Sequence, residues 1–504
     1  TNAHVIVEEA PASLHTSNST PDNTPIVWPL SARSEAALGQ RMVDLADFVQ
    51  AQTAVQAAVD TQAILATLTR GRQAMRHRHV IVAPNVQEAC ALLRQKAAGR
   101  VALNGPRVVY LFPGQGSQHP GMARGLYQQL PAFKDALDRC IAIANPLLTP
   151  CDQGPADLLA WLTHEDPKDA DMGALLAQTR YAQPALFCMS YALTAWLDSL
   201  GIEPQAMIGH SIGEYAAACW SGVMSLESAI TAVVARGQAM FEQRPGAMLA
   251  VRASADVVQA AMPAGVEIAA QNAPALTVVA GDFDAIDAFA AKLEAQDIGT
   301  TKLKVSHAFH SASMDAALPR VADALRAAHL QSPQIPLYSC VTGELLQAQQ
   351  ATDPQYWAQQ VRASVQFRRA VEAELAHGET VFIEVGPSQA LTALLRQYRS
   401  GQGKPANVVP LLGPASQAGQ PTLTALQGFG QIWAWGVNVA WPVPAQARRL
   451  TLPTYPFMGE RHWFKRKAAP ALNVATTPIE STLPQTVQIM SRIPRLQEEV
   501  IRII

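Results

Sequence analysis

The chain has 504 residues, of which 49% are hydrophobic and 15% are charged, and its formal net charge is −2. A chain of this length exceeds one hydrophobic core, so about two to four domains are expected. Its near-neutral charge gives no field that would attract nucleic acid or an anionic membrane, and its apolar runs are shorter than the ~20 residues of a membrane-spanning helix. We therefore expect neither nucleic acid nor a membrane as a partner.

The chain begins Thr1-Asn2-Ala3-His4, with no initiator methionine and no signal peptide, so we expect a piece cut from a larger protein. The six cysteines show no paired or metal-ligand spacing. We expect reduced core thiols in a cytoplasmic protein, with no bound metal. The cysteines lie at positions 90, 140, 151, 188, 219 and 340.

A small α/β unit is predicted near the start of the chain. A β-like run at 4–9 is followed by a stretch rich in Pro, Ser, Thr and Asn as far as Pro25, and this composition shift marks a boundary. Apolar residues then recur at strand and helix spacings until Gly99. The predicted elements are strands at 26–30 and 79–83 and helices at 34–51 and 86–97.

A larger domain opens at Arg107–Phe112, a near-continuous apolar run typical of a strand buried on both faces. It ends in the glycine-rich turn 113–118, which can bring backbone N–H groups to an anion but has the composition of an ordinary loop as well. No nucleotide-binding signature follows, so a nucleotide site is not expected. Helical patterns continue to Leu200, and we expect Pro184 to open a helix over 185–197.

The segment around Ser211 has the pattern of a nucleophile elbow. An apolar run at 206–208 meets Gly-His-Ser-Ile-Gly at 209–213, and an alanine-rich helical segment follows. We expect a tight turn that holds Ser211 in a strained, exposed conformation, with the helix start placing the Ile212 N–H near a developing oxyanion. The alternative is a chance Gly-x-Ser-x-Gly match in an alanine-rich protein.

The pattern after the elbow changes to short strands alternating with helices. Strand–helix–strand–strand–helix–strand is the order of a ferredoxin-like insert. Beyond it, a buried strand at 380–385 is the kind of element that completes a parallel sheet. The predicted elements of the insert are strands at 248–251, 266–270, 276–280 and 301–305 and helices at 256–262 and 283–296.

Five motifs occur in a fixed order: Phe-Pro-Gly-Gln-Gly-Ser-Gln at 112–118, Gly-His-Ser-Ile-Gly-Glu at 209–214, Arg236, His-Ala-Phe-His at 307–310 and Glu-Val-Gly-Pro at 384–387. Together they resemble the acyltransferase domains of modular type I polyketide synthases, which are related to malonyl-CoA:acyl-carrier-protein transacylases. The resemblance implies an α/β fold, with an α/β-hydrolase-like core built on a parallel sheet and a ferredoxin-like α+β insert, preceded by a small α/β linker domain.

The likeness extends over most of the chain. Residues 1–9 resemble the tail of a ketosynthase, and Leu452–Phe457 with Arg461-His462-Trp463 resembles the linker that wraps back after the acyltransferase. The implied division is a ketosynthase remnant at 1–15, a ketosynthase-to-acyltransferase linker domain at 16–103, an acyltransferase large subdomain at 104–245 and 307–404, a ferredoxin-like small subdomain at 246–306, a post-acyltransferase linker at 405–467, and a flexible tail at 468–504 leading to the next domain.

The resemblance also implies catalytic roles. Ser211 would be the nucleophile, and His310 would be the base that a serine needs at its ordinary pKa. The backbone N–H groups of Gln115 and Ile212 would form the oxyanion hole. The family orients its histidine with a backbone carbonyl, and here that carbonyl is assigned to Gln360.

Arg236 would bind the free carboxylate of the extender unit, a task that suits the planar, bidentate guanidinium. Without the resemblance, an arginine on a helix is interpreted as solvated or paired with a neighbour. His210, beside the nucleophile, is expected to be structural or to contact the substrate. His307 and Phe309 are also expected at the substrate.

The extender unit is expected to be malonyl. Ile212 stands where methylmalonyl-selective relatives tend to carry Gln, the stretch 179–183 resembles the malonyl type, and the 307–310 motif replaces their Tyr-Ala-Ser-His. The ring of Phe309 can fill the space that an α-methyl group would need. Exclusion of one methyl is worth only ~1–3 kcal/mol, so the preference should be leaky. The alternative is selectivity for methylmalonyl or another extender.

We therefore expect an enzyme that moves malonyl from malonyl-CoA, through a seryl ester, to the phosphopantetheine thiol of an acyl carrier protein. It would hold no cofactor of its own and would work beside a ketosynthase domain, and the isolated piece is expected to be a monomer. One rival is a thioester-hydrolysing serine hydrolase, against which Arg236 and the missing triad acid argue. The other is a decayed, non-catalytic docking module. After residue 467 globular character is lost until a helical pattern at 491–504.

Overall fold

The computed structural model describes residues 25–54, 59–95, 99–151, 154–399, 403, 405–413 and 420–459. The predictions for the ketosynthase-like start, for the Arg461-His462-Trp463 motif and for a terminal helix lie outside these residues. The division into domains stays a prediction at its boundaries, and the elements that follow are those of the described chain.

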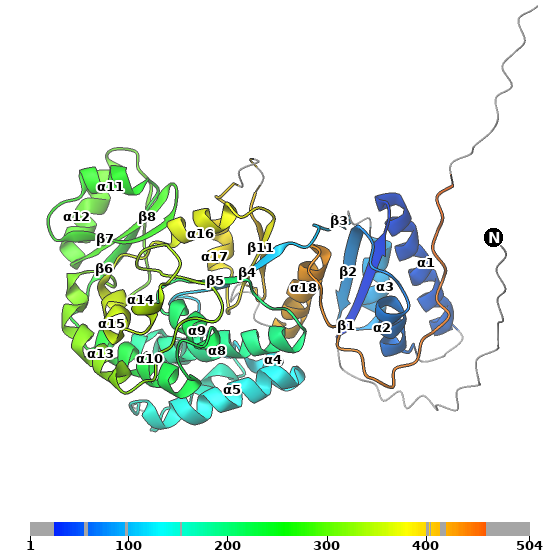
Figure 1. Cartoon of the computed structure of the whole chain (residues 1–504), viewed down its shortest axis with the longest axis horizontal. Coiled ribbons are helices and arrows are strands. Elements are labelled where there is room, and N and C mark those ends of the chain that lie inside the picture. The colour runs from blue at the N-terminus through cyan, green and yellow to red at the C-terminus, as the bar shows by residue number, and fades with distance from the viewer. Residues whose placement is uncertain are drawn as a thin grey trace, which may run out of the picture. The chain divides into compact units, whose positions relative to one another are not determined.

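A five-stranded parallel sheet lies at the centre of the larger domain (Figure 1), in the order β10–β5–β4–β11–β12. Alternate residues of β4 face two cores: Tyr110 and Phe112 pack into one, and Val109 and Leu111 into the other. Because both faces are covered, the strand has the near-continuous apolar run from which it was predicted. The strands are β4 Arg107–Phe112, β5 Ala206–Gly209, β10 Leu337–Tyr338, β11 Thr380–Glu384 and β12 Asn407–Pro410.

Helices on either side of this sheet supply the two cores. Helices α5, α8 and α9 contribute buried apolar residues to the core of Tyr110, whereas α16 and α17 contribute to the core of Val109. The helices of this domain are α4 Arg124–Gln129, α5 Pro131–Ala144, α6 Leu158–Leu162, α7 Ala170–Ala177, α8 Thr179–Ser199, α9 Gly213–Trp220, α10 Leu226–Phe241, α13 Leu318–Arg326, α14 Ala348–Ala351, α15 Pro354–Arg362, α16 Phe367–Leu375, α17 Ala390–Leu395 and α18 Pro421–Ala434, with 3₁₀ turns at Asn145–Leu147 and Ala312–Ala317.

Helix α8 begins earlier than predicted. The sequence placed its start at Pro184, but the helix begins at Thr179 and Pro184 lies inside it. A proline in a helix interior removes one backbone hydrogen bond and is usually unfavourable. Here almost every residue of the first three turns is buried, and this packing outweighs the local preference.

The insert between α10 and the 307–310 motif has the ferredoxin-like arrangement that was predicted from its order of strands and helices. Its four-stranded antiparallel sheet has the order β7–β8–β6–β9, so that β8 lies between the two strands joined by the first crossover helix. Figure 1 shows it at one end of the larger domain. Its elements are β6 Ala247–Val251, α11 Ala255–Ala261, β7 Val266–Ala273, β8 Leu276–Gly281, α12 Phe283–Glu294 and β9 Thr300–Lys302.

The predicted N-terminal α/β unit is a three-stranded antiparallel sheet with three helices. Two of its elements, helix α2 and the short strand β3, were not predicted from the sequence. Trp28 on one face of the sheet packs into the unit's own core, whereas Val27 and Val82 belong to the same core as Phe429 of α18. Gly430 allows this approach, since a Cβ there would lie 2.8 Å from Cγ1 of Val80. The elements are β1 Ile26–Ala32, α1 Glu35–Ala54, α2 Thr61–Arg70, β2 His77–Ala83, α3 Val86–Arg94 and β3 Arg100–Val101.

The segment after α18 returns to this unit, as expected for a linker that wraps back. Nη2 of Arg72 donates to the carbonyl oxygens of Leu452 (3.3 Å) and Pro453 (3.0 Å), and the backbone N–H of Arg33 donates to the hydroxyl of Tyr455 (3.0 Å). The side chain of Leu452 is buried in the unit's core. The two ends of the described chain are therefore held together.

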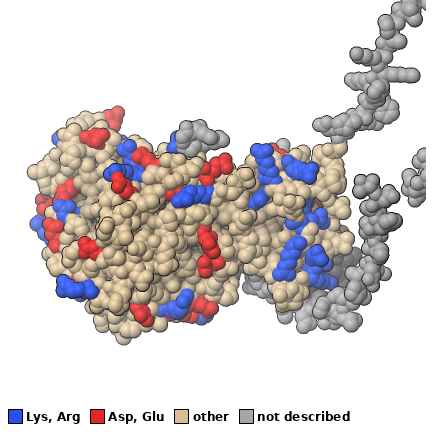
Figure 2. Space-filling view, viewed as in Figure 1, with Lys and Arg blue, Asp and Glu red and all other residues tan. Residues whose placement is uncertain are grey.

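On the face shown in Figure 2, acidic and basic side chains are interspersed over the larger domain, whereas basic side chains predominate over the N-terminal unit. None of the described helices is both long enough and apolar enough to cross a membrane.

Candidate active site

Ser211 lies in the turn between β5 and α9, in the predicted strand–turn–helix order. Its φ is 54°, in the left-handed region that residues other than glycine rarely adopt, and such strain is typical of functional sites. The flanking glycines are needed for close approach. A Cβ at Gly209 would lie 2.2 Å from Cα of Glu214, and one at Gly213 would lie 2.2 Å from the carbonyl oxygen of Phe112.

His310 contacts Ser211 directly. Its Nε2 is 2.8 Å from Oγ of Ser211, and its Nδ1 is 2.8 Å from the carbonyl oxygen of Ala363. Because a carbonyl oxygen only accepts, Nδ1 carries the hydrogen of the neutral ring, and Nε2 is left to accept the serine O–H. The pair is thus arranged for proton transfer from Ser211 to His310.

The carbonyl that makes the hydrogen bond to Nδ1 of His310 belongs to Ala363, three residues after Gln360, to which the sequence assigned it. The backbone of Gln360 also acts on this ring and, after that of Ala363, raises the pKa of His310. Helix α15 ends at Arg362 and Ala363 is extended, with ψ 145°, so its carbonyl turns away from the helix axis, whereas Gln360 lies inside the helix. A backbone group has no sequence signature, and which carbonyl is free depends on where the helix ends.

The ring of His310 is held neutral. Burial, with the charge of Arg236 and the neighbouring His210, lowers the pKa of His310 to about 3, against the opposing effect of the carbonyls of Ala363 and Gln360. At neutral pH the imidazole therefore has a free lone pair at Nε2, which is the form that a general base requires.

Arg236, on α10, is 0% exposed, and its guanidinium reaches the same hydroxyl. Nη2 donates to Oγ of Ser211 (3.2 Å) and to Oε1 of Gln360 (3.0 Å), and Nη1 donates to Oε1 of Gln183 (2.7 Å). All three acceptors are uncharged, and Nε is buried without an acceptor in the described chain. Burial lowers the pKa of Arg236, but an arginine remains charged in proteins. The site thus holds a buried cation with donor capacity to spare.

The loop after β4 packs beside the elbow. A Cβ at Gly114 would lie 2.9 Å from Nδ1 of His210, the residue before Ser211. Nε2 of Gln115 donates to Oγ1 of Thr179 (3.3 Å). Within the described residues, the backbone N–H groups of Gln115 and Ile212 have no hydrogen-bond partner, so both can donate to an incoming group.

The remaining predicted residues have partners of their own. Nε2 of His210 is 2.9 Å from Oδ1 of Asn272, on β7 of the insert, which ties the elbow to the smaller subdomain. Nε2 of His307 is 3.0 Å from the carbonyl oxygen of Gln243, and its ring stacks on Phe309 with centroids 5.8 Å apart and planes at 26°. Both rings are buried.

The sequence reasoning missed two side chains that the site brings together. Gln183, the last residue of the 179–183 stretch, accepts from Arg236, and Glu214, the last residue of the elbow motif, is a fully buried carboxylate joined to Gln360. Both stand inside stretches quoted for the resemblance. Their partners lie far away in the sequence, so no local pattern assigns them a role.

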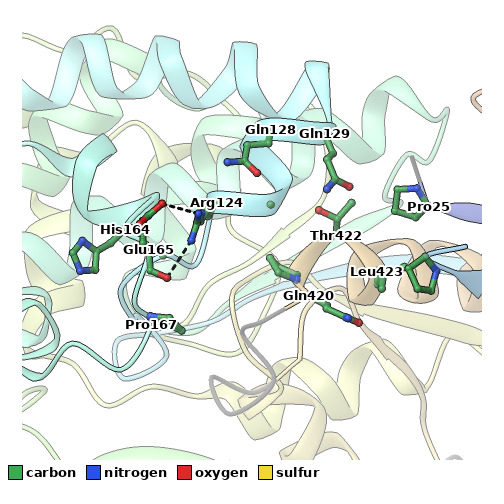
Figure 3. A pocket seen from close by; sticks show the side chains of 14 residues that line it. Pro25, Arg124, Gln128, Gln129, His164, Glu165, Pro167, Gln420, Thr422 and Leu423 are labelled. Carbon is green, nitrogen blue, oxygen red and sulfur yellow. Dashed lines mark hydrogen bonds and ion pairs between the residues drawn. The ribbon is translucent and has the colours of Figure 1, made fainter. Parts of the chain in front are cut away.

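The cavity in Figure 3 lies apart from these residues. It has a volume of about 400 Å³ and lies between the N-terminal unit, at Pro25, and helices α4 and α18, at Gln128 and Thr422. Arg124 at its wall is bonded to Glu165. In the described chain, no group of three or more His, Cys, Asp or Glu side chains is placed to hold a metal ion.

Two family models match the chain. One, described as an acyl transferase domain, matches residues 109–436, and one described as CurL-like, PKS C-terminal, matches residues 27–93. The chain is 39% identical over 482 residues to the phenolphthiocerol synthesis polyketide synthase type I Pks15/1 of Mycobacterium marinum, a match that covers 92% of this chain and 22% of that protein. It spans less than a third of the length of the curated relatives that it matches first.

Solved structures agree with this placement. The acyl transferase domain of SpnD, in complex with 2-(pent-4-yn-1-yl)malonyl, is 33% identical with a TM-score of 0.72, covering 82% of this chain and 96% of that one. The malonyl-CoA:acyl carrier protein transacylase FabD of Xanthomonas oryzae is 29% identical with a TM-score of 0.53, covering 63% of this chain and 98% of that one.

Proposed function

The chain belongs to the acyl transferase domain family, as an acyltransferase domain of a modular type I polyketide synthase, and from this membership we propose that it loads malonyl from malonyl-CoA onto the phosphopantetheine thiol of an acyl carrier protein. The reaction passes through an ester on Ser211. The observation that carries the proposal is the pair of contacts to Oγ of Ser211, from Nε2 of His310 at 2.8 Å and from Nη2 of Arg236 at 3.2 Å.

In the first half-reaction Nε2 of His310 takes the proton of Ser211 as Oγ attacks the thioester carbonyl. The N–H groups of Gln115 and Ile212 stabilise the oxyanion of the tetrahedral intermediate. Its collapse breaks the C–S bond, and coenzyme A leaves as a thiol with the proton held by His310. The carrier-protein thiol then gives its proton to His310 and attacks the ester. Collapse of this second intermediate breaks the C–Oγ bond, and His310 returns the proton to Ser211, which completes a ping-pong sequence.

Arg236 accounts for the choice of a dicarboxylic acyl group. Its hydrogen-bond acceptors, Gln183, Ser211 and Gln360, are all neutral, and its Nε has none in the described chain. A buried guanidinium of this kind is completed by a carboxylate, which it can bind through two parallel hydrogen bonds. The free carboxylate of malonyl supplies that group beside the reacting carbonyl.

Malonyl is preferred over methylmalonyl on the grounds of Phe309 and Ile212. The ring of Phe309 is buried and stacked on His307, and a ring held in this way would resist displacement by an α-methyl group. Gln183 and Thr179 also connect the 179–183 stretch to Arg236 and Gln115. The SpnD domain was solved with a substituted malonyl group; this is in keeping with a site for malonyl-type units.

The test is intact-protein mass spectrometry after mixing with malonyl-, methylmalonyl- and acetyl-CoA, followed by addition of a carrier protein bearing phosphopantetheine. We expect a malonyl adduct that disappears as the carrier protein gains the same mass. Loss of the adduct to free malonate, with no gain on the carrier protein, would instead identify a hydrolase. No adduct with any of the three donors would contradict the proposal.

A further inference from the structure

Glu214 is a carboxylate in an interior position, 0% exposed, three residues after Ser211. A buried carboxylate is costly unless its oxygens are well hydrogen-bonded. Oε1 accepts from the backbone N–H of Cys340 (3.1 Å) and from the hydroxyl of Tyr356 (2.7 Å), and Oε2 accepts from Nε2 of Gln360 (3.1 Å). Glu214 is not the acid of a Ser-His-acid triad, because Nδ1 of His310 is bonded to a backbone carbonyl.

The amide of Gln360 connects this carboxylate to the reacting centre. Its Nε2 donates to Oε2 of Glu214 and to the backbone oxygen of Ser211 (2.7 Å), and its Oε1 accepts from Nη2 of Arg236 (3.0 Å). A reversed amide would set Oε1 against two acceptors and the NH₂ group against a cation. The hydrogen-bond pattern therefore allows only one orientation of Gln360.

Burial raises the pKa of Glu214, whereas the hydrogen bonds from Cys340, Tyr356 and Gln360 favour its carboxylate form. In the relay Glu214–Gln360–Arg236, one neutral amide separates this carboxylate from the buried guanidinium. Burial lowers the pKa of Arg236, and Tyr215, Cys340 and the carboxylate of Glu214 oppose that effect. A direct ion pair would occupy guanidinium donors with a protein carboxylate. With Gln360 in between, Arg236 keeps its counter-charge, and its Nε–H has no acceptor in the described chain.

We propose that Glu214 is a positioning residue of the acyl-transfer site: through Gln360 it fixes the guanidinium of Arg236 in the orientation that receives the carboxylate of the acyl group, and it fixes the backbone of Ser211 beside it. This inference rests on the proposed function, because it concerns how the same site selects a dicarboxylic acyl group.

The decisive variant is Glu214→Gln, which replaces one oxygen by an NH₂ group at constant shape. The backbone N–H of Cys340 can only donate, so the amide oxygen must stay at the position of Oε1, and the NH₂ group falls where Oε2 was. Nε2 of Gln360 then faces another donor. If Gln360 turns over, its oxygen meets the carbonyl of Ser211 and its NH₂ group meets Arg236, so the mismatch reaches the guanidinium in either orientation.

The matched control is Tyr356→Phe. It removes a hydrogen bond to the same carboxylate, but on Oε1, away from Gln360. Each variant removes one favourable contact of Glu214 from the interior, and Tyr356→Phe also removes the contact of this hydroxyl with Ser339 (2.6 Å), so both should lower the melting temperature. Only Glu214→Gln should disturb the hydrogen bonds that connect position 214 to Arg236 through Gln360.

The measured quantity is the ratio of the rates at which malonyl-CoA and acetyl-CoA acylate Ser211, since only malonyl presents a carboxylate to Arg236. We expect Glu214→Gln to lower this ratio about tenfold, as for a misaligned charge-assisted hydrogen bond. Tyr356→Phe should leave the ratio within about twofold. A ratio unchanged in Glu214→Gln, or lowered equally in both variants, would overturn the inference and identify Glu214 as a structural residue.

If Glu214→Gln does not fold, Gln360→Met decides, because it removes the relay and leaves the carboxylate in place. The ratio should fall there too, and an unchanged ratio would overturn the inference. The wild-type chain distinguishes a failure of this inference from a failure of the proposed function. If it forms no malonyl adduct on Ser211, the proposed function is wrong and the inference falls with it. If the adduct forms and the ratios are insensitive, only the inference is wrong.

Discussion

Ser211 and His310, whose Oγ and Nε2 atoms lie 2.8 Å apart, both have left-handed backbones, with φ of 54° and 58°. Such a conformation costs a residue other than glycine of order 1–3 kcal/mol and persists only where the surroundings enforce it. Here Gln360 holds the carbonyl of Ser211, and the carbonyl of Ala363 holds the ring of His310. The hydroxyl and its base are therefore brought together by the fold before any substrate arrives.

Replacing Ser211 by alanine should abolish the malonyl adduct, because no other hydroxyl is in contact with His310 in the described chain. Peptide mapping of protein treated with malonyl-CoA is the measurement. Ser228→Ala, on helix α10, is the matched control and should keep the adduct, because the hydroxyl of Ser228 is bonded to that of Ser225 and lies outside the site. An adduct that persists in Ser211→Ala, or that maps to one of the cysteines, would show that Ser211 is not the nucleophile.

The rate of acylation should depend little on acidity across the range in which histidine usually titrates. A base whose pKa is lowered keeps its free lone pair until the pH falls through that pKa. With the pKa of His310 at about 3, the single-turnover release of coenzyme A should stay level from about pH 8 to about pH 5. An acidic limb near the ordinary histidine value in the wild-type chain would contradict this environment for His310.

The same profile tests the electrostatic contact between Arg236 and His310. After burial, the charge of Arg236 is the next largest cause that lowers the pKa of His310. In Arg236→Ala the pKa of His310 should rise, so the acidic limb of the rate profile should move to higher pH. Circular dichroism at each pH would separate this shift from unfolding.

Arg236→Ala should also impair malonyl transfer more than acetyl transfer. The lost charge-assisted hydrogen bonds to the carboxylate should lower the rate ratio of malonyl- to acetyl-CoA by about one to two orders of magnitude. Arg236→Lys keeps the charge but loses the planar, bidentate guanidinium, so its malonyl-to-acetyl rate ratio should lie between those of the wild-type chain and Arg236→Ala. If both donors lose rate equally in Arg236→Ala, the arginine serves the structure and does not select the substrate.

The paired change His307→Tyr with Phe309→Ser recreates the motif of methylmalonyl-type relatives and should open space near the acyl α-carbon. Because the two rings are stacked, we expect the pair to act together. The ratio of methylmalonyl to malonyl transfer should rise by about one order of magnitude, the limit of one methyl contact. Competition between the two CoA esters, followed by the mass of the acylated carrier protein, is the assay.

Total transfer should fall in this pair as well, because the change loosens the packing beside His310. Each single substitution is the control and should change the ratio less than the pair. An unchanged ratio with transfer still measurable would mean that the 307–310 motif reflects ancestry and does not shape the site.

The elbow, the buried strand β4 and the ferredoxin-like insert were predictable because each is encoded by a local pattern: glycines about a serine, a continuous apolar run, and alternating strand and helix periods. The start of α8 was not, since burial of the whole helix allowed Pro184 inside it. Helix α2 was also missed, and so was strand β3, which has only two residues.

Some residues of the candidate site could likewise be identified from the sequence, and others could not. Ser211 and His310 stand in recognisable motifs, whereas Arg236 was singled out by the family resemblance alone, and the structure places both His310 and Arg236 in contact with Oγ of Ser211. The carbonyl of Ala363 was missed because a backbone group carries no residue signature. Glu214 had no assigned role because its partner Gln360 lies 146 positions away, and only the fold brings the two together.

The core shared between β1, β2 and α18 has a consequence for how such chains can be recombined. Val27 and Val82 pack with Phe429, and the returning segment buries Leu452 in the N-terminal unit. A cut at either junction, near residue 104 or after α18, would expose these apolar surfaces to water and favour aggregation. An exchange of acyltransferases between synthases should therefore move residues 25–457 as one cassette, and hybrids joined inside that range should be less soluble than hybrids joined at its ends.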